Sequence, residues 1–320
     1  MRKLHYLEKR LQDAARIVLN NCLGVKKGEK AVVVTDESCR IIGLSFWYAL
    51  KEITDPLFIE MVPRSIHGEE PSPILKDILK ASDVYLIPTN CSLTHTQARI
   101  QASQSGARGT TMPGITVDIM TRTLNVDYQR IAKLTRRLTN LLSRAKKAII
   151  KTDENCELQL ELAGRRGFTD TGIIKKPGQF SNLPAGEAYI APAETKSNGT
   201  ILIDGSLAPV GYLSRPVRLE IKKGKIVKLI GNPHLKKIFA GYGPKEHILA
   251  EFGLGTNYKA QVTGNVLEDE KVLGSIHIAF GNNLGFGGKN RAKIHLDSVV
   301  RKPSVWIDKR LIIKEGKILL

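Results

Sequence analysis

Long apolar segments are absent from the sequence. No run of about 18 apolar residues, the length of a membrane-spanning helix, occurs anywhere. Residues 1–25 also lack the apolar core and the small-residue cleavage site of a signal peptide. Their apolar residues recur at helical spacing among charges, as Leu7, Leu11 and Ala15 do. We therefore expect a cytoplasmic protein that makes no contact with a membrane.

Cysteine is scarce and scattered. The chain has four cysteines, Cys22, Cys39, Cys91 and Cys156, and none forms a CxxC pair. This spacing argues against a zinc ribbon and against a disulfide framework. It suits a reducing compartment such as the cytoplasm.

Acidic residues are few relative to basic ones. The chain has 31 Asp and Glu against 49 Lys and Arg, a formal net charge of +18. Such a charge would suit a nucleic-acid-binding surface. The basic residues are spread along the chain, however, as pairs such as Lys26-Lys27 and Lys222-Lys223, with no aromatic-interleaved basic tract. Charged surfaces rich in lysine are also typical of heat-adapted proteins, so we do not expect a nucleic-acid partner.

The first part of the chain alternates short apolar segments with amphipathic ones. Strands are predicted at residues 31–35, 55–62, 83–89 and 108–115, and helices at residues 40–53, 71–82 and 92–106. This alternation predicts parallel strands with helical crossovers, an α/β domain. Residues 126–150 carry one apolar stripe at helical spacing and predict a long helix that leads out of this domain.

The pattern changes to a period of two after the long helix. Alternating segments such as "ELQLELAG" and "VRLEIKKGKIVKLIG" are separated by glycine-containing turns, which is typical of antiparallel hairpins. Residues 232–252 form the exception and are expected to be helical or irregular. We predict an α/β domain over residues 1–145 and a larger α+β domain over residues 146–320 that is β-rich, partly barrel-like and metal-binding.

One segment of the second domain, "IHLD", places a histidine and a carboxylate two residues apart. In a strand, residues i and i+2 point to the same face, so His295 and Asp297 would share a face opposite Leu296. An exposed hydrogen-bonded pair is the ordinary explanation. A functional interpretation therefore depends on other residues at the same place.

Four more polar residues interrupt apolar segments of this domain: Glu187, Glu251, Glu270 and His277. Each has an ordinary structural explanation when taken singly. Imidazole and carboxylate together, without cysteine, suit zinc, cobalt or manganese. The carboxylates of the full set carry four negative charges, which would balance two divalent cations and would repel one another without them. The set therefore indicates a site for two divalent metal ions.

Four motifs carry a resemblance to a known family. "NLPAGEAYIAP", "AEFGLGTN", "EDEKVLGSIHIAFG" and "IHLD" occur in the order found in the thermophilic aminopeptidase family typified by aminopeptidases T and S. The resemblance covers roughly residues 180 to 300. It implies a homodimer that hydrolyses the N-terminal residues of peptides through a metal-activated water. It also implies metal-binding roles for Glu187, Glu251, Glu270, His277, His295 and Asp297, with Glu251 or Glu270 as the group that moves the proton.

The chain departs from this family at one catalytic position. Leu284 stands where the family has its catalytic tyrosine, seven residues after His277. Tyr189, Tyr212 or Tyr242 could replace it. Without such a hydroxyl the peptidase activity should be weak.

Two other functions stay open. The ring-cleaving dihydroxypyridine dioxygenases resemble the same family distantly, use one iron in a two-histidine, one-carboxylate triad, and have a histidine where this chain has Glu251. A dioxygenase would have little use for Glu187 and Glu270. A non-catalytic basic protein, which would bind no metal, is the third possibility.

Overall fold

The computed structural model describes residues 2–320, with side chains from residue 7 onward. Contacts within the chain divide it into two compact units. The first comprises Met1–Ala132 and Asp170–Ala185, and the second comprises Lys133–Thr169 and Gly186–Leu320. The domain boundary proposed at residue 145 stays a prediction. These units differ from it in that the chain returns to the first unit at residues 170–185.

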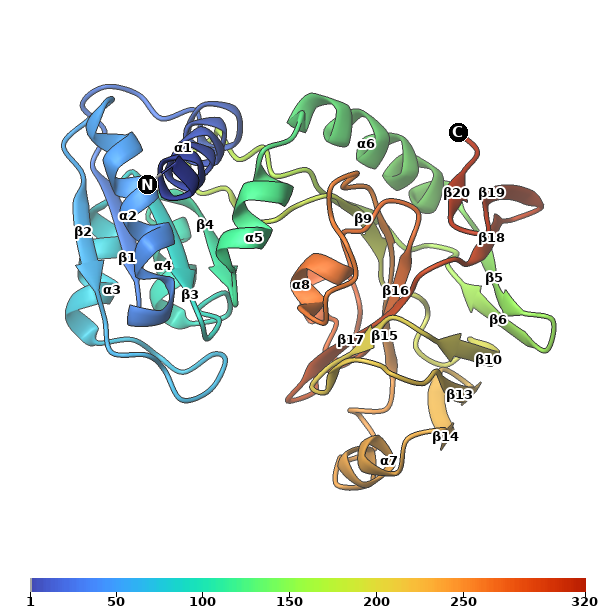
Figure 1. Ribbon diagram of the computed structural model, residues 1–320. Coiled ribbons are helices and arrows are strands. Elements are labelled where there is room, and N and C mark those ends of the chain that lie inside the picture. The colour runs from blue at the N-terminus through green and yellow to red at the C-terminus, as the bar shows by residue number, and fades with distance from the viewer. Residues whose placement is uncertain (1) are drawn as a thin grey trace. The chain divides into compact units, whose positions relative to one another are not determined.

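The first unit contains a parallel sheet in the order β2-β1-β3-β4-β8. Its strands are β1 (Ala31–Thr35), β2 (Leu57–Glu60), β3 (Val84–Thr89), β4 (Arg108–Pro113) and β8 (Phe180–Asn182). The main helices are α1 (Arg2–Ile17), α2 (Arg40–Lys51), α3 (Pro73–Ala81) and α4 (Gln97–Gln104), with the shorter α5 (Val117–Ile119) (Figure 1). The α/β prediction is confirmed. Strand β8 was not predicted, because it is short and its sequence, "FSN", is polar.

The second unit contains two largely antiparallel sheets. The first has the order β14-β13-β10-β6-β5-β18-β19-β20, and the second β12-β11-β17-β16-β15-β9-β7. Their longer strands are β5 (Lys147–Asp153), β6 (Cys156–Glu161), β10 (Asn198–Ile203), β13 (Val217–Lys222), β14 (Lys225–Ile230), β15 (Leu249–Gly255), β16 (Ile276–Gly281), β17 (His295–Val300) and β19 (Arg310–Lys314). The shorter ones are β7 (Gly167–Asp170), β9 (Glu187–Ile190), β11 (Ser206–Leu207), β12 (Gly211–Tyr212), β18 (Ser304–Ile307) and β20 (Lys317–Ile318). The predicted β-rich second domain is confirmed.

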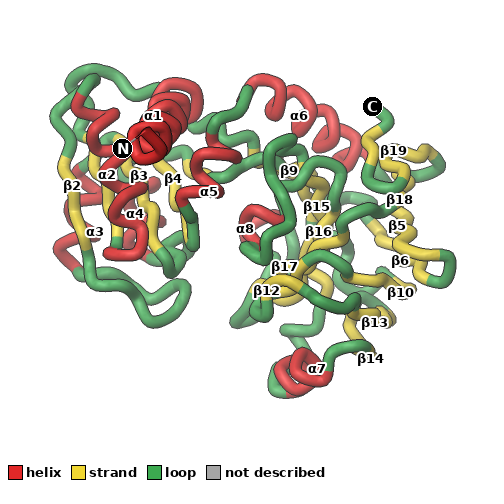
Figure 2. Tube along the Cα trace, in the orientation of Figure 1, coloured by secondary structure: helices red, strands yellow, loops and turns green. Residues whose placement is uncertain are grey.

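One core joins the apolar faces of both sheets. Ile201 and Leu219 from the first sheet and Phe252 and Ile278 from the second belong to the same cluster of fully buried residues. Burying each such side chain contributes about 1.5–3 kcal/mol. The end of α6 (Tyr128–Arg144) adds Leu138 and Leu142 to this core. Helix α7 (Pro233–Ala240) lies in the connection between β14 and β15, and α8 (Val266–Asp269) lies in the connection between β15 and β16 (Figure 2).

Residues 249–252 differ from the prediction, because they belong to a strand. A turn covers residues 244–247, and β15 begins at Leu249. Residues with opposite preferences alternate along this segment, which favours a strand. Phe252 and Leu254 face the core, and they alternate with Glu251, Gly253 and Gly255. The helix-like spacing of apolar residues ends before Leu249, so the segment that carries Glu251 forms a strand.

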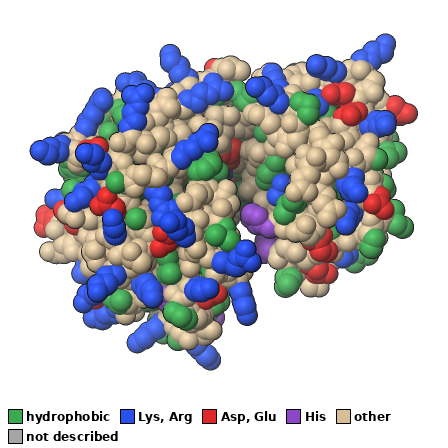
Figure 3. Space-filling view, turned by 180° about the vertical axis from the view of Figure 1, so that it is seen from behind, with side chains coloured by type: hydrophobic (Ala, Val, Ile, Leu, Met, Phe, Trp, Pro, Cys, Tyr) green, Lys and Arg blue, Asp and Glu red, His purple; other side chains and the backbone are tan. Residues whose placement is uncertain are grey.

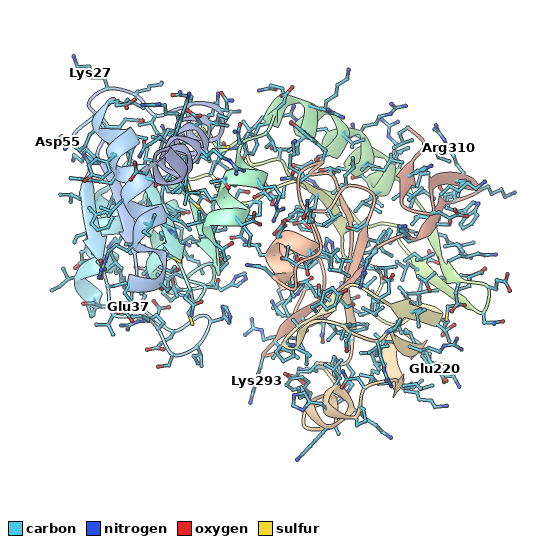
Figure 4. All side chains as sticks on the ribbon, viewed as in Figure 1. Lys27, Glu37, Asp55, Glu220, Lys293 and Arg310 are labelled. Atoms are coloured by element: carbon cyan, nitrogen blue, oxygen red, sulfur yellow. The ribbon has the colours of Figure 1, made fainter. Side chains whose placement is uncertain are left out.

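Basic side chains are distributed over the surface. Figure 3 shows Lys and Arg projecting from the visible face with acidic side chains between them. Lys27, Lys293 and Arg310 are exposed and point outward in Figure 4. Among the described residues, no helix has the length and the apolar character needed to cross a membrane.

Candidate metal centre

Four neighbouring strands of the second sheet bring five of the six predicted residues to one face, and Glu270 directly follows helix α8. The strands lie in the order β17-β16-β15-β9. Along each strand the core-facing residues alternate with polar or small ones. The polar residues are His295 and Asp297 on β17, His277 on β16, Glu251 on β15 and Glu187 on β9. His295 and Asp297 therefore share a strand face, as the two-residue spacing predicts.

Small residues opposite the polar ones make room above the sheet. Gly253 pairs with His277, and a Cβ at residue 253 would lie 2.0 Å from Cε1 of that ring. Gly255 pairs with Glu187, and a Cβ there would lie 2.0 Å from the carbonyl oxygen of Val272. The two glycines therefore allow an imidazole and a chain segment to lie directly on the sheet.

Glu251 lies between the two histidines. Its Oε1 is 3.4 Å from Nε2 of His277, and its Oε2 is 3.2 Å from Nε2 of His295. Nε2 of His295 is also 3.4 Å from Oδ1 of Asp297. The other ring nitrogen, Nδ1 of His295, is 2.8 Å from the carbonyl oxygen of Asn282 and donates to it, because a carbonyl can only accept. Nε2 is therefore the ring nitrogen that faces the two carboxylates, and in a neutral His295 it is the one that would coordinate a metal.

All six predicted ligands meet in three overlapping groups. Within each group the ligand atoms lie within 4.8 Å of one another. The groups are Glu187, Glu251 and His277; Glu251, His295 and Asp297; and Glu270, His277 and Asp297. The structure thus brings together every residue that the sequence singled out. Their roles as ligands stay a prediction.

Burial and charge interactions shift the pKa values of these side chains strongly. Burial would raise the pKa of Glu251, but hydrogen bonds and charge interactions with His277 and His295 outweigh it and lower the pKa to about 2. Burial opposes the charged form of His277 as well, yet the surrounding carboxylates raise its pKa to about 9. Burial, with repulsion from Glu187 and Asp297, raises the pKa of Glu270 to about 8. The close carboxylates thus favour a positive charge on His277 and oppose a negative charge on Glu270.

The donor set fits a divalent metal. Carboxylate oxygens with imidazole nitrogens suit iron, manganese, zinc or cobalt. Nδ1 of His277 is buried and lacks a hydrogen-bond partner among the described residues. The most open group is Glu251, His295 and Asp297, because the side chains of His295 and Asp297 are 28% and 18% exposed.

Sequence reasoning missed Lys271. Its ammonium nitrogen lies 2.5 Å from Oε1 of Glu187 and 2.7 Å from Oε1 of Glu270, and its side chain is 2% exposed. A lysine that follows three acidic residues is typical of a solvated turn. The one signal against that interpretation was the apolar pair Val272-Leu273 directly after it.

Three aromatic rings lie next to the group formed by Glu251, His295 and Asp297. The ring of Phe286 contacts His295 edge-on at 5.8 Å between centroids, and Tyr189 lies 5.6 Å from Phe286. Phe168 stacks on Tyr189 at 5.7 Å. All three rings are half-buried. We use the term aromatic wall for Phe168, Tyr189 and Phe286.

Comparison with known proteins decides the family. The model of the 2,5-dihydroxypyridine 5,6-dioxygenase family matches residues 10–320. The chain belongs to this family. The 2,5-dihydroxypyridine 5,6-dioxygenase of Pseudomonas putida is 23% identical over 195 residues, a match that covers 56% of each chain. The chain thus matches about half the length of this curated relative.

Solved structures show the shared fold. The structure of the 2,5-dihydroxypyridine dioxygenase from Pseudomonas putida KT2440 has a TM-score of 0.80 at 18% identity, over 98% of this chain and 97% of that one. AmpT from Thermus thermophilus has a TM-score of 0.74 at 14% identity, over 98% and 99%. The expected likeness to the aminopeptidases is confirmed for the fold. The family is that of the dioxygenase, which was the alternative expectation.

The residue at the position of the aminopeptidase tyrosine is exposed. Leu284 begins a short helical turn, Leu284–Phe286, and is 43% exposed. Of the three tyrosines considered as replacements, Tyr189 contacts Phe286, the ring that lies against His295. Tyr212 lies beside Arg301, and Tyr242 packs on Phe239. In this member of the dioxygenase family, the turn brings Phe286 into contact with His295.

Proposed function

We propose that this protein is a metal-dependent dioxygenase that opens a planar, hydroxylated aromatic ring, with hydroxypyridines as the first class to test. The observation that carries the proposal is the contact between Phe286 and His295, which joins the aromatic wall to the open metal-binding group. Rings prefer offset-stacked or edge-to-face contact with other rings. Membership of the 2,5-dihydroxypyridine 5,6-dioxygenase family supports the same substrate class.

Glu251, His295 and Asp297 would hold the metal. Iron bound there would supply the redox chemistry that lets O2 react with the ring. In the overall reaction the ring bond breaks and both atoms of O2 enter the product, so no external reductant is consumed. The group has one histidine and two carboxylates, in contrast to the two-histidine, one-carboxylate triad of many non-haem iron oxygenases.

The protein's own side chains orient the substrate. The aromatic wall offers a flat apolar surface that excludes water on one side of the metal group. The exposed guanidinium of Arg166 lies 5.7 Å from the Phe168 ring and would attract an anionic substituent of the substrate. Hydrogen bonding of His295 to the Asn282 carbonyl keeps Nε2 directed at Glu251 and Asp297.

A loop clamp positions Phe286. Arg165 donates to the carbonyl oxygen of Gly287 at 2.5 Å and forms an ion pair with Glu194. Glu194 also accepts from the backbone N–H of Lys289 at 2.6 Å and from the side-chain amide of Asn283. These bonds hold both ends of the turn that carries Phe286.

A two-metal aminopeptidase is the second candidate. The position of Glu251, with one oxygen near each histidine, favours it, because a carboxylate in this position can bridge two metal ions. The lack of a tyrosine at residue 284 and the ammonium of Lys271 inside the cluster speak against it.

Oxygen consumption separates these candidates. The full-length protein would be reconstituted with ferrous iron without air and then mixed with 2,5-dihydroxypyridine, other dihydroxypyridines or catechols in an oxygen electrode. Parallel samples with zinc or cobalt would be given leucine p-nitroanilide. Iron-dependent oxygen uptake without anilide hydrolysis is expected. Anilide hydrolysis with zinc or cobalt, and no oxygen uptake with any ring, would establish the peptidase instead.

A further inference from the structure

Lys271 is a buried lysine whose ammonium group lies within the carboxylate cluster. Its ammonium nitrogen contacts Glu187 at 2.5 Å and Glu270 at 2.7 Å. Glu187 in turn places its other oxygen 3.3 Å from Nε2 of His277. A buried lysine is rare unless it is paired with a carboxylate, and here it is paired with two.

The backbone fixes this lysine in place. The N–H of Lys271 donates to the carbonyl of Glu268, and its carbonyl accepts from Asn257 at 2.8 Å. The Lys271 carbonyl carbon lies over Gly255, so close that a Cβ at residue 255 would be 2.8 Å from it. The ammonium therefore reaches the carboxylates from a chain segment that rests directly on β15.

The ammonium occupies the position of a possible bridging cation. Two carboxylate oxygens that each lie within 2.7 Å of one nitrogen have no space between them for a metal ion as well. The cluster contains four carboxylates, from Glu187, Glu251, Glu270 and Asp297. The charge of Lys271 neutralises part of this set, at Glu187 and Glu270.

We propose that Lys271 is a built-in cation that takes the place of a second metal ion and limits the centre to one metal, bound at Glu251, His295 and Asp297. Glu187 and Glu270 then position Lys271 and do not bind metal. The inference rests on the metal site of the proposed function, and does not depend on the reaction with O2.

Metal stoichiometry tests this inference. The full-length wild type, Lys271→Met and Lys271→Arg would be reconstituted with excess Co2+, dialysed, and analysed for cobalt by plasma mass spectrometry. One ion per chain is expected for the wild type and Lys271→Arg. A twofold rise is expected for Lys271→Met, with a change in the visible cobalt spectrum. Two ions in the wild type, or one ion in a folded Lys271→Met variant, would overturn the inference.

A second pair of variants covers the case in which Lys271→Met does not fold. Glu270→Gln should keep one cobalt ion per chain, because Glu270 holds the lysine, whereas Asp297→Asn should lose it. If Glu270→Gln also loses the metal, Glu270 is a ligand and the inference fails. A wild type that binds one ion but never consumes oxygen would refute the proposed dioxygenase and leave the role of Lys271 intact.

Discussion

The imidazole of His277 lies across the backbone of Gly253 on the neighbouring strand. A Cβ at residue 253 would come within 2.0 Å of Cε1 and 2.2 Å of Nε2. Any residue with a Cβ would therefore fit at position 253 only if the imidazole ring moved. The position of one histidine of the centre is thus set by the absence of a side chain on another strand.

Gly253→Ala should displace His277 and weaken the centre. Overpacking of this kind costs about 1–3 kcal/mol of folding free energy, and Glu251 loses its hydrogen bond to the ring. Chemical denaturation and a cobalt titration would measure both effects. Gly285→Ala is the matched control, since a Cβ at residue 285 meets no atom within 4 Å. Equal stability and affinity for the two variants would contradict the assigned packing.

His295→Ala and Asp297→Asn should each reduce metal affinity. Loss of a residue that only supports a ligand typically costs about 10–100-fold in affinity, so loss of a ligand should cost at least as much. His247→Ala is the control, because His247 is bonded to the Gly243 carbonyl and packs on Phe239. Metal loss in His247→Ala with retention in His295→Ala would show that the metal is elsewhere.

Phe286→Ala should raise KM for an aromatic substrate and leave the metal content unchanged. One aromatic pair contributes about 0.5–1.5 kcal/mol, which corresponds to a change of about 2–12-fold. Steady-state kinetics with metal analysis on the same sample would show it. Leu284→Ala, in the same turn but exposed, should behave as wild type. A KM that is unaffected by Phe286→Ala would remove the aromatic wall from the substrate site.

The clamp at Glu194 should make stability depend on pH. Burial would raise the pKa of Glu194, but hydrogen bonds from the Lys289 backbone and the charge of Arg165 outweigh it and lower the pKa. A group with a lowered folded-state pKa stabilises the fold above its unfolded pKa and loses that effect as the pH falls through the folded value. Thermal unfolding of wild type and Glu194→Gln should therefore differ at neutral pH and converge in acid. A difference that is constant with pH would exclude this role.

The parts of the fold that could be predicted from the sequence are those in which apolar residues recur at a regular helical or two-residue spacing. The four motifs and the polar residues that interrupt apolar segments selected all six residues of the cluster, and the strand alternation placed His295 and Asp297 on one face. The three residue groups and the open side could not be predicted, because they depend on the register between β15, β16 and β17.

Lys271 and Phe286 were missed for physical reasons. The local sequence of Lys271 is that of a solvated turn, and its burial comes from long-range contact with Glu187 on β9. Phe286 lies in a glycine-rich loop whose conformation depends on Arg165 and Glu194, which are remote in sequence. Strand β8 was missed because its pairing with β4 depends on the return of the chain to the first unit.

Isotope labelling tests the central claim most directly. The iron-reconstituted protein would convert a dihydroxypyridine under 18O2, and mass spectrometry would follow the product. Ring opening by this family member predicts that both labelled oxygen atoms appear in one product molecule, and that Asp297→Asn yields none. A product that carries label from 18O-water alone, or peptide hydrolysis with no oxygen uptake, would contradict the proposed dioxygenase.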